Sequence, residues 1–247
     1  MVKVLMPVPG SAFDPTETAV PWFILTKRGH EVIFATPDGM VGQADSRMCT
    51  GQDLGLLSSL LRADANGRAA YGAMAQSPAF QNPVRWANVR TQDFDALLLA
   101  GGHAPGMKVY LESTLLQTQV AEFFAQNKPV GAICHGVLLA ARSRDAHGVS
   151  VLNAKKTTAL TKQMEMSAWA LTCAWLGNYY RTYPESVQAE VTRALAHPGQ
   201  FVGGPMALLR DSPEHPERGF TLRDGNYLSA RWPGDAHRFA QDFCAML

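Results

Sequence analysis

The sequence lacks the long apolar runs, the charge excess and the paired cysteines that mark several large classes of protein. No apolar run approaches the roughly 18–20 residues that span a bilayer, so no membrane partner is expected. The 247 residues carry 22 basic and 21 acidic side chains without a basic stripe, which argues against a nucleic-acid partner. The four cysteines lie far apart without a CxxC pair, which argues against zinc ribbons and disulfide scaffolds. A reduced, cytoplasmic protein is therefore expected.

Nucleotide-binding motifs are absent as well. The glycine-rich segment 101–106 does not match GxGxxG, and no Walker A motif occurs. A lone histidine such as His103 is not a metal site. The sequence therefore predicts neither a metal ion nor another cofactor.

Strand-like and helix-like segments alternate along the chain. With 47% hydrophobic residues, the chain has enough apolar side chains for one sizeable core, and we expect one domain over residues 1–247. The apolar patterns predict strands at 2–8, 30–35, 95–100 and 130–133 and helices at 14–28 and 111–126. This order predicts an α/β fold in which a mostly parallel sheet lies between helices.

The second half of the chain gives a looser pattern. It predicts a strand at 156–160, helices at 164–176 and 186–197, a β-hairpin at 220–230 and a last helix at 233–245. We expect the segment within about 162–219 to form a helical extension or cap. Its aromatic-rich part, residues 168–205, favours helical packing, with a cap or dimer surface as the alternative.

Residues 130–136, Val-Gly-Ala-Ile-Cys-His-Gly, form the most informative segment. A short apolar strand stops at Cys134, and a helical run begins at His135. A residue at such a corner sits in a tight, strained turn with its side chain at the sheet edge, the geometry of a nucleophile elbow. The helix N-terminus and the adjacent imidazole are expected to favour a thiolate. A buried, inert thiol is the alternative.

Two further side chains are candidates for acid–base chemistry. His135 is a candidate general acid or base, although neighbouring helix residues face different ways, so it need not touch the Cys134 sulfur. Glu17 follows Asp14 and Pro15, a pattern equally typical of a helix capping box. A capping Glu17 would reach back to the backbone near Asp14, whereas a catalytic Glu17 would point at Cys134.

Gly101, Gly102 and His103 follow the strand predicted at 95–100. Glycines there allow backbone N–H groups to face a developing oxyanion, and His103 is expected to line the pocket. A tight strand exit and an ordinary loop end are the alternatives. Because open α/β sheets bind ligands at the carboxyl ends of their parallel strands, we expect these residues to lie near Cys134.

Together these residues resemble the ThiJ/PfpI superfamily, the cysteine-containing relatives of class I glutamine amidotransferases. The matching pieces are Glu17, Gly-Gly-His at 101–103 and Ala-Ile-Cys-His-Gly at 132–136. The superfamily includes the Parkinsonism-associated deglycase, glutathione-independent glyoxalases (glyoxalase III), holding chaperones and some hydrolases and hydratases. The resemblance implies a flavodoxin-like three-layer α/β/α sandwich, no cofactor and a homodimer.

The resemblance also implies a mechanism. A protonated Glu17 would hydrogen-bond the Cys134 thiolate, which adds to a small-molecule carbonyl substrate such as methylglyoxal. Glu17 and His135 would move the protons, and the backbone N–H groups of Gly102 and His135 would stabilise the oxyanion. Larger relatives often carry an acidic residue that orients the histidine. Glu165 is the nearest acidic residue in that region and is the candidate third member of a triad.

Three functions stay open on these grounds. The first is a glyoxalase III-like lyase (a hydro-lyase) or a related deglycase acting through a hemithioacetal on Cys134. The second is a hydrolase or hydratase at the same site. The third is a non-enzymatic stress-response protein, a redox sensor or holding chaperone whose Cys134 oxidises to a sulfinic acid.

Overall fold

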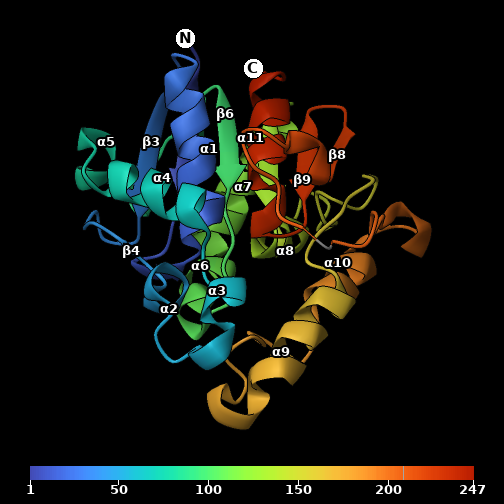
Figure 1. Cartoon of the computed structure of the whole chain (residues 1–247). Helices are drawn as coiled ribbons and strands as arrows, with labels where there is room; N and C mark the ends of the chain where they lie inside the picture. The colour runs from blue at the N-terminus through green and yellow to red at the C-terminus, as the bar shows by residue number, and fades with distance from the viewer. Residues whose placement is uncertain (208) are drawn as a thin grey trace.

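The computed structural model describes residues 1–207 and 209–247, and its centre is a sheet between two layers of helices (Figure 1). Within these residues the main sheet has seven strands in the order β5-β3-β1-β6-β7-β9-β8. Its strands are β1 (Lys3–Pro7), β3 (Glu31–Thr36), β5 (Val84–Arg85), β6 (Ala96–Leu99), β7 (Val130–Ile133), β8 (Thr221–Asp224) and β9 (Tyr227–Ala230). Neighbouring strands are parallel except for the antiparallel β8–β9 pair. A second, two-stranded sheet pairs β2 (Ser11–Phe13) with β4 (Gln43–Ala44).

The helices form two layers around this sheet. They are α1 (Pro15–Lys27), α2 (Ser46–Thr50), α3 (Ser58–Leu61), α4 (Ala65–Ala75), α5 (Pro78–Gln81), α6 (Lys108–Leu111), α7 (Thr114–Ala125), α8 (His135–Arg142), α9 (Lys162–Leu176), α10 (Val187–Ala194) and α11 (Ala236–Cys244). α1 packs against α4 and α11 in front of the sheet in Figure 1, and α8 packs against α6 and α7 behind it. The predicted three-layer α/β/α fold with a mostly parallel sheet is confirmed.

The central strands are apolar at every position because helices cover both faces of the sheet. β6 (Ala-Leu-Leu-Leu) and β7 (Val-Gly-Ala-Ile) are buried throughout, as expected of parallel strands. A Cβ at Gly131 would lie 2.9 Å from the Phe243 ring and 3.0 Å from the Phe239 ring. Glycine in β7 therefore lets the aromatic side chains of α11 approach the sheet.

Several predicted elements differ from the structure, among them the helix predicted at 186–197, which ends at Ala194, and the last helix, which begins at Ala236. Residues 156–160 form no strand but make one isolated bridge, from Thr157 to Phe201, because β9 already pairs with β7 on one side and β8 on the other. The helix predicted from 111 begins instead at Thr114, since the Ser113 hydroxyl accepts from Leu116 N at 3.2 Å and caps α7.

Residues 162–219 contain α9 and α10. α10 packs against α8 and α9, and α9 runs away from the sheet toward the lower edge of the view (Figure 1). α2 and α3 lie near the same lower end. Among residues 1–207 and 209–247, no helix combines the length and apolar character needed to cross a membrane.

Candidate active site

Cys134 occupies a strained turn between β7 and α8. Its backbone N–H continues the sheet by donating to Ala230 O at 3.1 Å, and its φ of 56° and ψ of −122° are rare for a residue with a side chain. A Cβ at Gly136 would lie 2.2 Å from Leu99 O. Only glycine therefore lets the first turn of α8 pack so closely against β6. This is the backbone geometry expected of a nucleophile elbow.

The Glu17 side chain points toward this elbow instead of closing a capping box. Asp14 Oδ1 caps α1 by accepting from Thr16 N at 2.8 Å and Glu17 N at 3.0 Å. Glu17 Oε2 accepts from Gly101 N at 3.0 Å, while Asp14 N donates to Gly101 O at 2.9 Å. A Cβ at Gly101 would lie 2.6 Å from Glu17 Oε2 and 2.8 Å from His135 N. Gly101 thus leaves the space in which Glu17 and the start of α8 meet.

Burial favours the protonated forms of both Glu17 and Cys134. Burial, together with the Asp14 carboxyl, raises the pKa of Glu17 well above its ordinary value. Burial and the neighbouring Glu17 and Asp14 carboxyls likewise raise the pKa of the Cys134 thiol. Cys134 is 4% exposed, so a thiolate would lose most of its hydration, while the backbone N–H of His135 acts in the opposite direction and lowers the pKa. Burial thus opposes the thiolate expected from the sequence.

His135 contacts the thiol directly. Its Nδ1 lies 3.4 Å from Cys134 Sγ, and its Nε2 lies 3.1 Å from Thr182 Oγ1. The Thr182 hydroxyl donates its hydrogen to His103 O at 2.6 Å, so it accepts from His135 Nε2–H. The lone pair of Nδ1 consequently faces the thiol. Burial lowers the pKa of His135 to about 3, which keeps the imidazole neutral.

Thr182, and not Glu165, is the third member of this chain of contacts. Glu165 Oε2 accepts from Val187 N at 2.9 Å, and its side chain lines the pocket wall without a hydrogen bond to His135. The geometry does not support a Cys134–His135–Glu165 triad. No local motif marks Thr182, which comes from the loop between α9 and α10.

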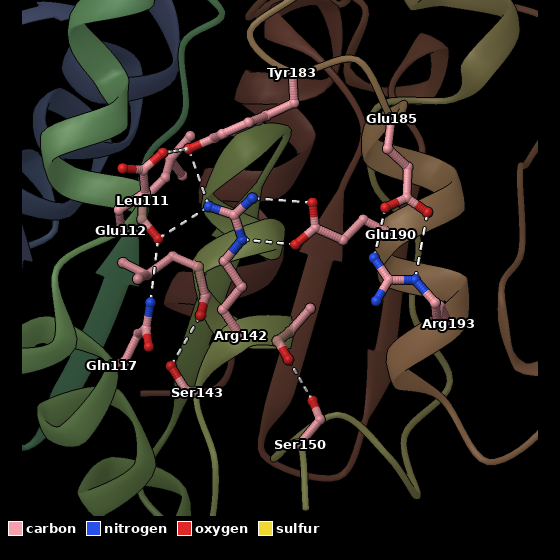
Figure 2. A network of polar contacts seen from close by, with 12 residues as sticks. Leu111, Glu112, Gln117, Arg142, Ser143, Ser150, Tyr183, Glu185, Glu190 and Arg193 are labelled. Atoms are coloured by element: carbon pink, nitrogen blue, oxygen red, sulfur yellow. Dashed lines mark hydrogen bonds and ion pairs between the residues drawn. The ribbon is translucent and has the colours of Figure 1, made fainter.

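A partly buried polar network holds the loop that carries Thr182 (Figure 2). Arg142, the last residue of α8, donates to both carboxylate oxygens of Glu190 at 2.7 and 2.9 Å and to Tyr183 Oη at 3.0 Å. Tyr183 in turn donates to Glu112 Oε1 at 2.9 Å. The neighbour of Thr182 is thereby tied to the far end of the helix that His135 begins.

Gly102 and His103 lie on the wall of the same site. Gly102 has a φ of 151°, and a Cβ there would lie 2.9 Å from Asp14 N. His103 stacks on the Tyr180 ring with centroids 4.4 Å apart. Burial lowers the pKa of His103 to about 4, so this imidazole is also neutral.

One pocket brings the predicted residues together. Cys134, Glu17, Gly102 and His103 line a cavity of about 1100 Å³. Within residues 1–207 and 209–247, no group of three or more His, Cys, Asp or Glu side chains is arranged to hold a metal ion. His135 and Gly101 do not line the cavity, so the arrangement provides a thiol and a carboxyl on the cavity wall and a neutral base that contacts the thiol from within the protein.

The family model described as ThiJ/PfpI family-like matches residues 8–198. The chain therefore belongs to the ThiJ/PfpI family. An uncharacterized protein of Schizosaccharomyces pombe is 27% identical over 124 residues, which are 49% of this chain and 45% of that protein. The chain thus matches less than half the length of this curated relative.

Solved structures share the fold over nearly the full chain. Glyoxalase III from Candida albicans is 20% identical, with a TM-score of 0.69 over 100% of this chain and 97% of its own. The Rapid Encystment Protein of 24 kDa from Francisella tularensis is 18% identical, with a TM-score of 0.69 over 100% and 99%. At these identities the likeness concerns the fold.

Proposed function

We propose that this protein is a cysteine-dependent enzyme that converts 2-oxoaldehydes into 2-hydroxy acids without glutathione. The observation that carries the proposal is the 3.4 Å contact between Cys134 Sγ and His135 Nδ1 beside the buried Glu17 carboxyl. The family membership and the glyoxalase III fold support it. A deglycase that removes such carbonyl adducts would use the same groups.

The first chemical step forms a bond between Cys134 Sγ and the aldehyde carbon. The thiol proton passes to His135 Nδ1 as the sulfur attacks. Because burial lowers the pKa of His135 to about 3, the imidazolium does not persist and returns the proton to the new alkoxide. The backbone N–H groups of Gly102 and His135 are our candidates for stabilising that oxyanion. The product of this step is a hemithioacetal.

The second step moves hydrogen within the substrate. The C1 proton passes to the neutral His135 while the protonated Glu17 gives its proton to the C2 carbonyl oxygen, which gives an enediol. His135 then protonates C2, and the C1 hydroxyl proton returns to Glu17, which leaves a thioester. We assign this exchange to Glu17, assisted by His135. Water then hydrolyses the thioester, and Cys134 is again a thiol. Overall, RCOCHO and water give RCH(OH)COOH, with no external oxidant or reductant.

The test is incubation of the purified protein with methylglyoxal in glutathione-free buffer, with lactate measured by NMR. We expect lactate from the native protein and none above background from Cys134→Ala. Turnover that survives Cys134→Ala would remove the thiol from the mechanism.

A hydrolase is the second candidate, because the Cys134–His135 contact alone suffices for attack on an ester or amide. Acyl hydrolysis needs no proton exchange between two carbons, so it should depend on His135 and tolerate Glu17→Gln. Two results together would favour the hydrolase: p-nitrophenyl acetate is still hydrolysed by Glu17→Gln, and the native protein forms no lactate from methylglyoxal. The redox-sensing alternative also depends on Cys134, and the intact mass after mild peroxide treatment tests it.

A further inference from the structure

The pocket over Cys134 is much larger than a three-carbon aldehyde needs. Its volume of about 1100 Å³ is at the upper end of pockets that hold drug-sized ligands. Apolar side chains from separate parts of the chain line it, among them Leu60, Leu160, Met164 and Trp232. Methylglyoxal would contact only a small part of this lining, which suits a substrate with an apolar chain.

Five residues that line this pocket carry a buried polar atom without a hydrogen-bond partner among the described residues. The atoms are Arg210 Nη1, Tyr180 Oη, His103 Nε2, Glu17 Oε1 and Trp232 Nε1. Tyr180 is only 8% exposed. Since a buried donor or acceptor without a partner costs free energy, this group is suited to a polar ligand.

Arg210 is positioned but not neutralised. Its Nη2 donates to Leu60 O at 3.3 Å and Leu61 O at 3.4 Å, and its guanidinium lies 5.4 Å from the Trp232 ring. Its positive charge opposes the rise in pKa that burial causes at Asp14 and Tyr180. Across the described part of the chain, however, no carboxylate forms an ion pair with it.

Arg231, also in the pocket wall, shows the contrasting case. Its Nε and Nη2 each donate to Asp235 at 2.9 Å, and Nη1 donates to Gly203 O at 3.4 Å and to Pro205 O. Each Arg231 side-chain nitrogen therefore already has an acceptor within the protein. Arg210 Nη1 is therefore the cationic donor in this pocket that is left for a ligand.

We propose that the substrate is a carbonyl compound with a carboxylate and an apolar chain, whose carboxylate binds Arg210 Nη1 and Tyr180 Oη. Both groups donate, which suits an acceptor-only carboxylate. Asp14 and Asp64, which both line the pocket, oppose the anion, but Asp14 Oδ1 already accepts two backbone N–H groups and Asp64 Oδ1 accepts one. The carbonyl carbon then lies at Cys134. This assignment of the substrate class rests on the proposed function.

Turnover of a matched substrate pair tests the proposal. 4,5-Dioxopentanoate carries the carboxylate, and its methyl ester lacks the charge. We expect the acid-to-ester ratio of kcat/KM to exceed one by about tenfold in the native protein, the effect of one charge-assisted hydrogen bond, and to approach one in Arg210→Met. Lys162→Met removes an exposed charge beside the pocket and should leave the ratio unchanged. A native ratio near one, or an unchanged ratio in Arg210→Met, overturns the proposal.

Tyr180→Phe is the second variant because it removes a hydroxyl without a described partner. We expect it to lower the ratio severalfold without lowering the Tm; a loss of Tm with an unchanged ratio would make the hydroxyl structural and contradict its assignment to the ligand.

Binding to a protein that cannot react separates this proposal from the proposed function. Calorimetry with hexanoate and Cys134→Ser should give a Kd that rises about tenfold when Arg210→Met is added. If no 2-oxoaldehyde is turned over but hexanoate binding depends on Arg210, the proposed function fails and the carboxylate site stands. If methylglyoxal is turned over but hexanoate binding ignores Arg210, the carboxylate site fails and the proposed function stands.

Discussion

The two ends of α8 hold polar groups in opposite states. At its N-terminal end Cys134 has a strained backbone, and Glu17 Oε1 has no hydrogen-bond partner among the described residues. At its C-terminal end each of the three Arg142 nitrogens has an acceptor, supplied by Glu190, Tyr183 and Leu111 (Figure 2). The first end is buried, with Glu17 and His135 at 0% exposure, whereas the Arg142 and Glu190 side chains are 19% and 17% exposed. Incomplete satisfaction of polar groups, together with deeper burial, therefore distinguishes the end suited to chemistry.

The cavities beside the two ends differ in the same way. The pocket beside Arg142 has a volume of about 300 Å³, and its wall includes Arg142, Glu190 and Arg193. These charges already pair, Arg142 with Glu190 and Arg193 with Glu185. The larger pocket over Cys134 contains groups that still lack partners. Variants at each end test whether this distinction separates catalysis from stability.

The largest effect is expected from Glu17→Gln. Glutamine can still accept from Gly101 N–H and donate toward Cys134, but it cannot carry a proton. We expect kcat for methylglyoxal to fall by about 10²- to 10⁴-fold, the range for a lost general acid–base group, with little change in Tm. Lactate assays and thermal melts measure the two quantities. A fall in Tm that accounts for the lost activity would instead assign Glu17 to the fold.

Arg142→Met tests the other end of α8 and should act mainly on stability. It leaves the Glu190 carboxylate, 17% exposed, without its partner. We expect the free energy of unfolding in urea to fall by about 2–3 kcal/mol, somewhat less than for a fully buried pair. The matched control is Arg193→Met, whose side chain is 66% exposed and whose loss should change stability by less than about 1 kcal/mol. Equal losses in the two variants would contradict the comparison.

The elbow was predictable from sequence because it depends on neighbouring residues. An apolar strand ends at Cys134, and Gly136 allows α8 to pack on β6. The direction of Glu17 was not predictable. Asp14 caps α1 whichever way Glu17 points, and the choice depends on Gly101, 84 residues further along the chain. Thr182 was missed for the same reason, since its contacts with His135 and His103 exist only in the folded chain.

Thr182→Val should have a smaller effect than Arg142→Met. Thr182 contacts His135 at one end of α8, and its neighbour Tyr183 contacts Arg142 at the other end. Valine keeps the shape but removes the acceptor of His135 Nε2–H, so we expect a stability loss of about 1–3 kcal/mol. Nitrogen NMR of His135 should show the proton leaving Nε2 or becoming shared with Nδ1, and methylglyoxal turnover should fall. Thr182→Ser should restore both. A single Nε2–H tautomer in Thr182→Val would mean that another group orients the imidazole.

The smallest expected effect is a dependence of the free energy of unfolding on pH that arises from His135. Because its pKa is lowered from 6.5 to about 3 in the folded protein, only the unfolded chain binds this proton between those values. Its contribution is therefore complete above pH 6.5 and is lost as the pH falls, by up to about 1.4 kcal/mol per pH unit. Burial raises the pKa of Asp14 to about 6, so Asp14 makes the protein less stable as the pH rises. This contribution is the same in the native protein and in His135→Gln.

The difference in unfolding free energy between native protein and His135→Gln isolates this slope, because other groups cancel. Between pH 6.5 and 5 we expect the difference to shrink by about 1.6 kcal/mol, measured by urea denaturation at each pH. A neutral imidazole at pH 5 also means that kcat/KM for methylglyoxal has no acid limb near pH 6.5. A difference in unfolding free energy that stays constant with pH, together with an acid limb of kcat/KM near pH 6.5, would show that the pKa of His135 is not lowered. The two ends of α8 would then differ less than the geometry indicates.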